Sequence, residues 1–135
     1  SMGEHGDSSM VPFSAVTVGG VPFDRLGLDK SAILTQTRRA GMDIIEGKGS
    51  TEFGIGLALA QLAAAILGDQ HRVLPVSVLL EGEYGQQGVH CGVPCRIGRR
   101  GIEEIVVLDL TQQEQQQLDA SCQVIRKHIA LADSL

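Results

Sequence analysis

The chain has 135 residues and a formal net charge of −5 at pH 7, and 43% of its residues are hydrophobic, which suits one folded domain over residues 1–135 and excludes a disordered chain. Aromatic residues make up only 3% and tryptophan is absent, so a module that stacks bases on aromatic side chains is not expected. Because the acidic balance provides no basic surface, we expect no nucleic-acid partner and no membrane partner.

The first stretch of interest is Gly3-Glu4-His5-Gly6-Asp7-Ser8, which follows a Ser1-Met2 pair that resembles a protease-cleavage remnant and an initiator methionine. Glycines disfavour both helix and strand and let the backbone approach a ligand, so we expect a turn to present His5. A neutral imidazole there can accept a proton near physiological pH. The alternative is an ordinary solvent-exposed histidine near a terminus.

A hairpin and a helix are predicted next. Residues 13–18 alternate like a strand and end in Gly19-Gly20, and two glycines between β-forming residues indicate a tight turn into residues 21–23. Asp29 is typical of a helix N-cap, and the apolar spacing after it predicts an amphipathic helix up to Gly47.

A glycine-rich turn, residues 47–51, leads into a second helix. Its Gly-Lys-Gly-Ser-Thr composition is that of a phosphate loop, but the Walker spacing is absent, and a simple helix cap by Ser50 or Thr51 is the alternative. Residues 53–67 are apolar on nearly every face and too few to span a membrane. We therefore expect residues 53–67 to form the buried central helix of the domain.

Three strand-like segments follow, at residues 71–80, 89–97 and 102–110, and their short connections predict an antiparallel sheet. Thr111 with Glu114 three residues later predicts a capping box at the start of a closing amphipathic helix. The expected fold class is α+β: a β-hairpin, two consecutive helices of which the second is buried, an antiparallel three-stranded sheet and a C-terminal amphipathic helix.

The cysteines Cys91, Cys95 and Cys122 are odd in number, and no signal-peptide pattern precedes them. We therefore expect a reduced, cytoplasmic setting. Cys91 and Cys95 with the neighbouring His90 supply only part of a zinc ligand set, and no second cluster completes it. The three cysteines are expected to be small buried hydrophobes, with no metal site.

Several stretches together resemble the C-terminal, substrate-binding half of the lactate/malate dehydrogenase family, and most closely its bacterial L-lactate dehydrogenases. Their order and spacing match from Gly3 to about Ala130. The stretches are Gly3-Glu4-His5-Gly6-Asp7-Ser8, Lys48-Gly49-Ser50-Thr51, Leu74-Pro75-Val76-Ser77, Leu80-Glu81-Gly82-Glu83-Tyr84-Gly85, Gly92-Val93-Pro94 and Ile97-Gly98-Arg99-Arg100-Gly101.

The resemblance implies an oxidoreductase that interconverts L-lactate and pyruvate with NAD as cofactor. In that family the residue at His5 is the catalytic acid/base, which exchanges a proton with the substrate oxygen while hydride moves to or from the nicotinamide. Thr51 matches the position that lines the substrate pocket, and Ile55 matches the apolar residue under the nicotinamide ring. Thr51 and Ile55 are one helical turn apart and so share a face of the helix start.

The resemblance also implies that much of the active site lies upstream of Gly3. The glycine-rich dinucleotide loop of the Rossmann half has no counterpart here, nor do the aspartate that orients the histidine, the arginine that binds the substrate carboxylate and the arginine of the mobile loop. This chain alone is therefore expected to be inactive.

Three alternatives stay open at this point. The substrate can be malate instead of lactate, the chain can act as a non-enzymatic assembly module, or it can be an independent binding protein for a 2-hydroxy acid. We also expect self-association of the chain, and a homotetramer in the full-length enzyme, because residues 53–67 are apolar on more faces than the other elements can cover.

Overall fold

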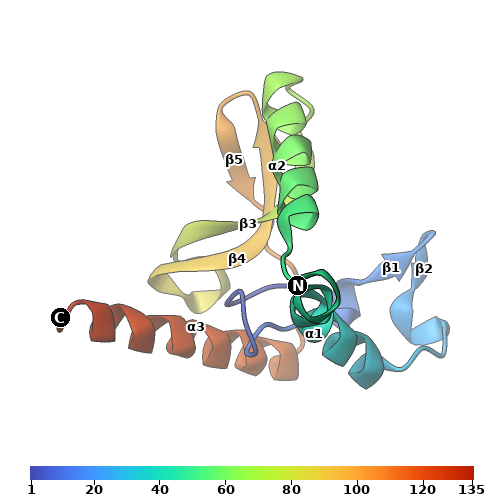
Figure 1. Ribbon diagram of the computed structural model, residues 1–135, viewed down its shortest axis with the longest axis horizontal. Helices are drawn as coiled ribbons and strands as arrows, with labels where there is room; N and C mark the ends of the chain where they lie inside the picture. The colour runs from blue at the N-terminus through green and yellow to red at the C-terminus, as the bar shows by residue number, and fades with distance from the viewer.

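The computed structural model describes residues 1–135, and Figure 1 shows its elements in chain order. The hairpin β1–β2 stands apart from an antiparallel sheet of order β3-β4-β5, and three helices complete the α+β class predicted from the sequence. The elements are β1 (Thr17–Val18), β2 (Val21–Pro22), α1 (Lys30–Lys48), α2 (Glu52–Leu67), β3 (Arg72–Glu81), β4 (Gln87–Gly98), β5 (Gly101–Ile105) and α3 (Gln112–Ala132).

The central strand β4 supplies most of the core. It pairs with β3 along that whole strand and with β5 only near its own end. Alternate β4 residues point to one side, as the period of a strand requires, and there they pack against α2 and α3 (Figure 1). The fully buried residues of this contact are Val89, Cys91, Val93, Cys95 and Ile97 of β4, Ala65 of α2, and Leu118 and Cys122 of α3.

Two helix starts agree with their predicted caps. The Asp29 carboxylate accepts from the amides of Ser31, at 2.8 Å, and Ala32, at 3.1 Å, and α1 ends at Gly49 with φ +88°. At α3, the Thr111 side chain accepts from the Glu114 amide and the Glu114 carboxylate accepts from the Thr111 amide, which completes the capping box. These caps satisfy backbone groups that have no partner inside a helix.

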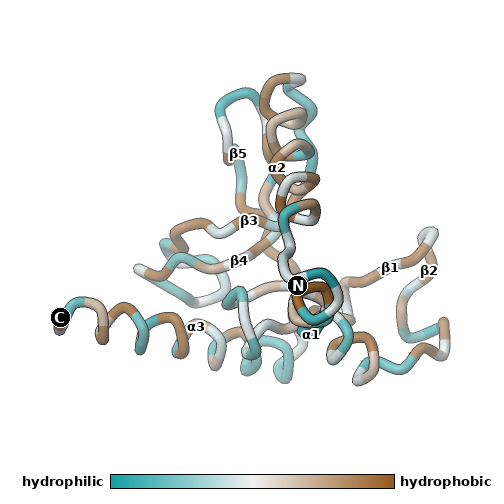
Figure 2. The backbone as a smooth tube through the Cα atoms, viewed as in Figure 1, coloured by the Kyte–Doolittle hydropathy of each residue, from teal (hydrophilic) through white to brown (hydrophobic).

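The expected burial of the second helix is wrong. Only Ala65 of α2 is buried, with Leu62 and Ile66 packed beside it against the core, because a three-stranded sheet covers one side of the helix. Most of the other large apolar residues are exposed, and Figure 2 shows α2 as a largely brown helix that projects from the molecule. We call this set the exposed α2 surface: Phe53, Ile55, Leu57, Leu59 and Leu67, which are 58–81% exposed.

Two predicted strands are shorter than expected. Residues 13–15 form a 3₁₀ turn instead of a strand, because the Phe13 ring packs against the Phe23 ring at 4.8 Å and curls the segment. β5 ends at Ile105 instead of Leu110, because the following backbone bonds to the Tyr84 hydroxyl. That hydroxyl donates to the carbonyl of residue 106 at 2.8 Å and accepts from the amide of residue 108 at 3.0 Å.

None of the helices is both long enough and apolar enough to cross a bilayer.

Candidate active site

The His5 loop, residues 3–9, is closed at its base by backbone pairing. The Met2 amide donates to the Met10 carbonyl at 2.8 Å, and the Met10 amide donates back at 3.0 Å. Gly3 pairs in the same reciprocal way with Gly92 of β4, at 2.9 and 3.0 Å. The loop therefore continues the sheet along the part of β4 that β5 leaves unpaired, and its base has the rigidity of a strand.

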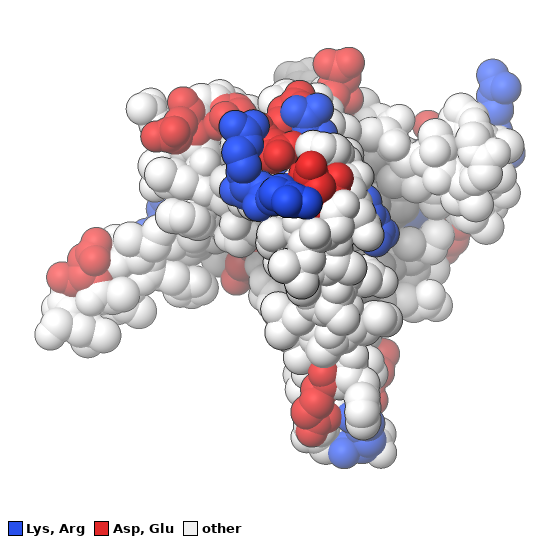
Figure 3. Space-filling model, turned by 90° about the horizontal axis from the view of Figure 1, so that it is seen from above, with Lys and Arg blue, Asp and Glu red and all other residues white.

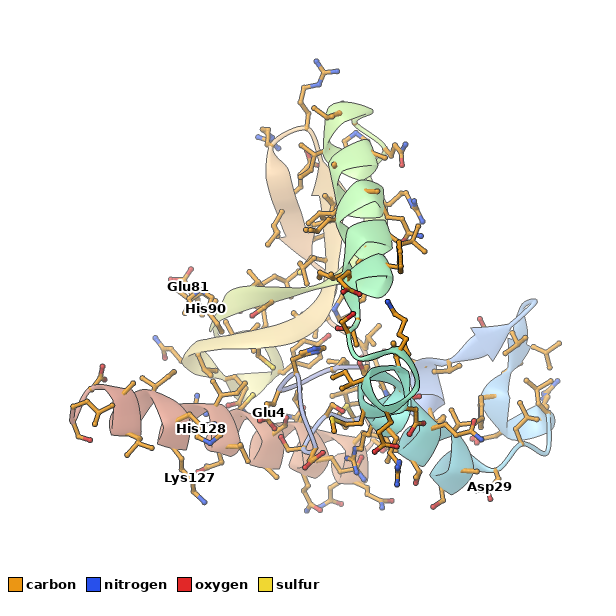
Figure 4. The ribbon with its side chains drawn as sticks, in the orientation of Figure 1. Glu4, Asp29, Glu81, His90, Lys127 and His128 are labelled. Carbon is orange, nitrogen blue, oxygen red and sulfur yellow. The ribbon has the colours of Figure 1, made fainter.

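Ser121 of α3 holds the inner side of this loop. Its hydroxyl accepts from the Glu4 amide at 2.8 Å and lies 3.0 Å from the Ser8 hydroxyl, while the Glu4 carboxylate accepts from both the amide and the hydroxyl of Ser8. Figure 4 shows Glu4 between the sheet and α3. Gly3 has φ +94°, and a Cβ at this position would overlap the Ser121 side chain, so the close approach requires glycine.

Arg38 of α1 holds the outer end of the loop. Its guanidinium donates from Nε to the Ser9 carbonyl at 3.0 Å and from Nη2 to the same oxygen. A guanidinium that donates twice to one carbonyl fixes both position and direction. Two helices and a strand thus fix the backbone on either side of His5.

His5 itself is exposed and lines a cavity of about 490 Å³. β3 contributes Pro75 and Ser77 to the wall, β4 contributes His90, and α3 contributes Ile125. No hydrogen bond within the chain engages the His5 ring, so both ring nitrogens face this cavity or solvent free of intramolecular partners. The arrangement is a proton-transfer group on a rigid loop at the rim of a small polar cavity.

The structure places Ile55 beside this cavity and leaves Thr51 outside its lining. Ile55, 60% exposed, lines a second, mostly apolar cavity of about 260 Å³ between α2 and β3. Pro75 and Val76 line both cavities, so the two cavities adjoin at this segment of β3. Thr51 stands at the N-cap position of α2, but its side chain makes no capping hydrogen bond, which leaves its hydroxyl available to a ligand.

The His5 loop is held in place by three residues whose role the sequence did not predict: Arg38, Gly92 and Ser121. Ser121 had a signal, because it stands on the apolar face of α3 between Leu118 and Ile125, where a hydroxyl needs a partner. The sequence contained no such signal for Arg38, because its partner is a backbone carbonyl 29 residues away in the sequence.

A second group of titratable side chains lies at the far end of the sheet. His71 Nδ1 lies 2.8 Å from Glu103 and His71 Nε2 lies 3.6 Å from Asp69, and Arg96 and Arg100 approach Glu103 at 3.9 and 3.8 Å. Figure 3 shows red and blue side chains gathered together on this end of the molecule. Glu103 already has two arginines beside it, and Asp69 accepts from the amide of residue 99 at 2.7 Å, so the group fits a structural network of ion pairs and hydrogen bonds.

The fold has well-matched neighbours among solved structures, and these define its class. The malate dehydrogenase from Salinibacter ruber superimposes with a TM-score of 0.92 at 35% identity, over 99% of this chain and 45% of that one. MGS-M5, a lactate dehydrogenase enzyme from a Medee basin deep-sea metagenome library, gives a TM-score of 0.90 at 36% identity, over 96% of this chain and 44% of that one. The class is the α+β C-terminal domain of such dehydrogenases.

Sequence comparison gives the family. The profile described as lactate/malate dehydrogenase, alpha/beta C-terminal domain, matches residues 2–134, and this chain belongs to that family. L-lactate dehydrogenase 3 of Bacillus anthracis is 44% identical over 96% of the chain, and L-lactate dehydrogenase of Fusobacterium nucleatum is 42% identical over 98%. The chain spans about 44% of the length of the first relative and 45% of the second.

Proposed function

We propose that this chain is the substrate-binding and acid/base half of an NAD-dependent dehydrogenase that interconverts L-lactate and pyruvate in the cytoplasm. The observation that carries the proposal is the His5 loop. An exposed imidazole with no internal partner stands on a backbone fixed by β4, α1 and α3, at the rim of a cavity of about 490 Å³. The family membership and the named L-lactate dehydrogenase relatives support lactate as the substrate.

His5 performs the proton transfer in this proposal. In the oxidation direction the neutral ring accepts the proton of the substrate hydroxyl, and in the reduction direction the imidazolium donates it to the ketone oxygen. An imidazole can both accept and donate a proton, so one side chain serves both directions. One ring nitrogen faces the substrate, and the other is free for a carboxylate from elsewhere in the full-length enzyme to orient the ring.

Ile55 fits the cofactor position that the family resemblance assigns to it. The cavity that it lines is bounded mainly by hydrophobic side chains, among them Leu59, Leu62 and Leu74, and such a wall suits one face of a flat nicotinamide ring. NAD supplies the hydride acceptor when bound. Thr51, one turn before Ile55, directs its uncapped hydroxyl to the substrate and so contributes to the choice between substrates.

The histidine assignment is tested in a full-length enzyme that carries this sequence. His5→Asn is expected to lower kcat at least about 100-fold while NAD affinity stays within twofold. His90→Asn is the matched control, because His90 lines the same cavity from β4, and its kcat is expected to stay within threefold. If His5→Asn also stayed within threefold, His5 would be an ordinary exposed histidine.

Two further assays test whether the 135-residue chain is active by itself and which substrate the full-length enzyme prefers. The 135-residue chain alone is expected to show no NAD-linked oxidation of L-lactate, because the groups that bind the dinucleotide and the substrate carboxylate have no counterpart in it. Turnover by the pure chain that His5→Ala abolishes would contradict this. In the full-length enzyme, a higher kcat/KM for oxaloacetate than for pyruvate would make malate the substrate.

A role in assembly is the second candidate, and the exposed α2 surface favours it. Large apolar patches are rare on soluble monomers, and covering about 400 Å² of such surface is worth roughly 10 kcal/mol before association costs of similar size. We propose that the chain self-associates through this surface and that the full-length enzyme is a homotetramer.

A further inference from the structure

The core contains two cysteine side chains in contact that the proposed reaction does not use. Cys91 of β4 and Cys122 of α3 approach with their sulfur atoms 3.6 Å apart, and the Cys122 thiol donates to Cys91. Their exposed fractions are 1% and 0%. Cys95 lies four residues after Cys91 on the same face of β4 and is buried as well. Its thiol, however, points at the carbonyl of residue 93.

The two thiols differ in chemical character. Donation from Cys122 lowers the pKa of Cys91 against the opposing effect of burial, and the Gly3 amide and the Arg126 charge act in the same direction. The same hydrogen bond, with burial, raises the pKa of Cys122. Burial likewise raises the pKa of Cys95. Of the two, Cys91 is the thiol whose thiolate form is favoured, and Cys122 is the one that is held protonated beside it.

We propose that Cys91 and Cys122 form a redox-active pair that a hydroperoxide converts into a disulfide between β4 and α3. The Cys91 thiolate attacks one oxygen of hydrogen peroxide, the O–O bond breaks, and hydroxide leaves as water after it takes a proton. The Cys122 sulfur then attacks the sulfenic sulfur of Cys91 as its proton passes to the leaving hydroxide, which departs as a second water. Two thiols and one peroxide thus give one disulfide and two waters.

A cavity adjoins the residues beside this pair. The cavity of about 490 Å³ beside His5 is lined by Gly92, the residue after Cys91, and by Ile125, which is one helical turn after Cys122. Hydrogen peroxide that enters this cavity reaches the residue next to Cys91 and a side chain one helical turn from Cys122. Bond formation brings the sulfur atoms from 3.6 Å to the roughly 2.0 Å of a disulfide.

A disulfide here acts on the two points that hold the His5 loop. Gly92 follows Cys91 and pairs with Gly3, and Ser121 precedes Cys122 and accepts from the Glu4 amide. Shortening the sulfur–sulfur distance by about 1.5 Å draws these anchors together and shifts the backbone of the loop. Disulfide formation does not depend on the proposed function, whereas an effect on catalysis does.

The test uses the 135-residue chain, hydrogen peroxide and peptide mass mapping without reduction. Titratable thiols are expected to fall from three to one, with Cys91 and Cys122 in one linked peptide pair and Cys95 free. Cys95→Ser should form the same link. Cys122→Ser, with Cys122→Ala in case serine disturbs the core, should leave a sulfenic acid on Cys91 that dimedone traps. In urea, the preference for this pair should disappear.

Three results would overturn the proposal. The first is a disulfide that includes Cys95, and the second is a set of disulfides that form only between chains. The third is that all three thiols stay intact at a peroxide concentration that oxidises free cysteine. Coupling to the loop is read from the imidazole NMR signal of His5, which is expected to move on oxidation and return with dithiothreitol. An unmoved signal in the linked protein would refute the coupling, and neither measurement depends on dehydrogenase activity.

Discussion

Glu114 should make the stability of this domain depend on pH in acid. Its side chain is nearly buried, at 8% exposure for the residue, and it accepts from the amides of Ser14 and Thr111 at 2.9 Å each and from both hydroxyls. Burial by itself would raise the pKa of this carboxyl, but these hydrogen bonds outweigh burial and hold the pKa at about 2, against an ordinary 4.5.

The size and sign of the effect follow from this difference in pKa. A carboxyl whose pKa is lower in the folded state stabilises fully above its unfolded pKa and loses that contribution as the pH falls through the folded value. A lowering from 4.5 to about 2 corresponds to about 3 kcal/mol of unfolding free energy at pH 7 and about 1 kcal/mol at pH 3.

Urea unfolding of the wild type and Glu114→Gln between pH 7 and pH 3 measures this contribution. The variant should be less stable by about 2–3 kcal/mol at pH 7, and the difference should shrink steadily below pH 5. Glu46→Gln, at an exposed position of α1, is the control and should change stability by less than about 0.5 kcal/mol. A Glu114→Gln effect that matched the control, or that stayed constant down to pH 3, would refute the argument.

Three further predictions concern the loop, the pocket and assembly. Gly3→Ala should cost at least about 2 kcal/mol in urea unfolding, whereas Gly19→Ala, also at positive φ but in open space, should cost about 1 kcal/mol; equal costs would remove the steric argument. Thr51→Val should change the ratio of kcat/KM between substrates and leave Tm within about 2 °C, since its hydroxyl caps nothing; a lower Tm with an unchanged ratio would make it a helix cap. Light scattering at micromolar concentration should show a species larger than 14.3 kDa that Leu57→Glu weakens at least tenfold and Leu135→Glu does not; a clean monomer would contradict assembly through α2.

The sequence predicted those parts of the fold that depend on neighbouring residues. The Asp29 cap and the Thr111–Glu114 capping box each act over three residues, and the apolar spacing of α3 marks the face that packs on β4. Residues 53–67 show the limit of such reasoning. Their composition predicts a buried helix, but it does not reveal that the three-stranded sheet covers only one side of it.

In the candidate site, too, the local feature was predictable from the sequence and the long-range contacts were not. The glycines around His5 indicate a presented loop, and the structure has one. Its exact placement depends on contacts that are distant in sequence, from Ser9 to Arg38 and from Glu4 to Ser121. No local pattern encodes these contacts, because each partner is a single polar group whose direction is set by the packing of a whole helix. The roles of His5, Thr51 and Ile55 stay predictions.

The reciprocal pairing of Gly3 with Gly92 also has a consequence for hydrogen exchange at the base of the His5 loop. These amides are released to exchange with solvent only when the edge of the central strand opens, so their hydrogen exchange should be as slow as that of the sheet, although the loop lies at the surface. Rotation about the side-chain bonds of the histidine is much faster, in picoseconds to nanoseconds. A ligand that reaches the ring meets a backbone that is already ordered, and binding loses little entropy in this loop.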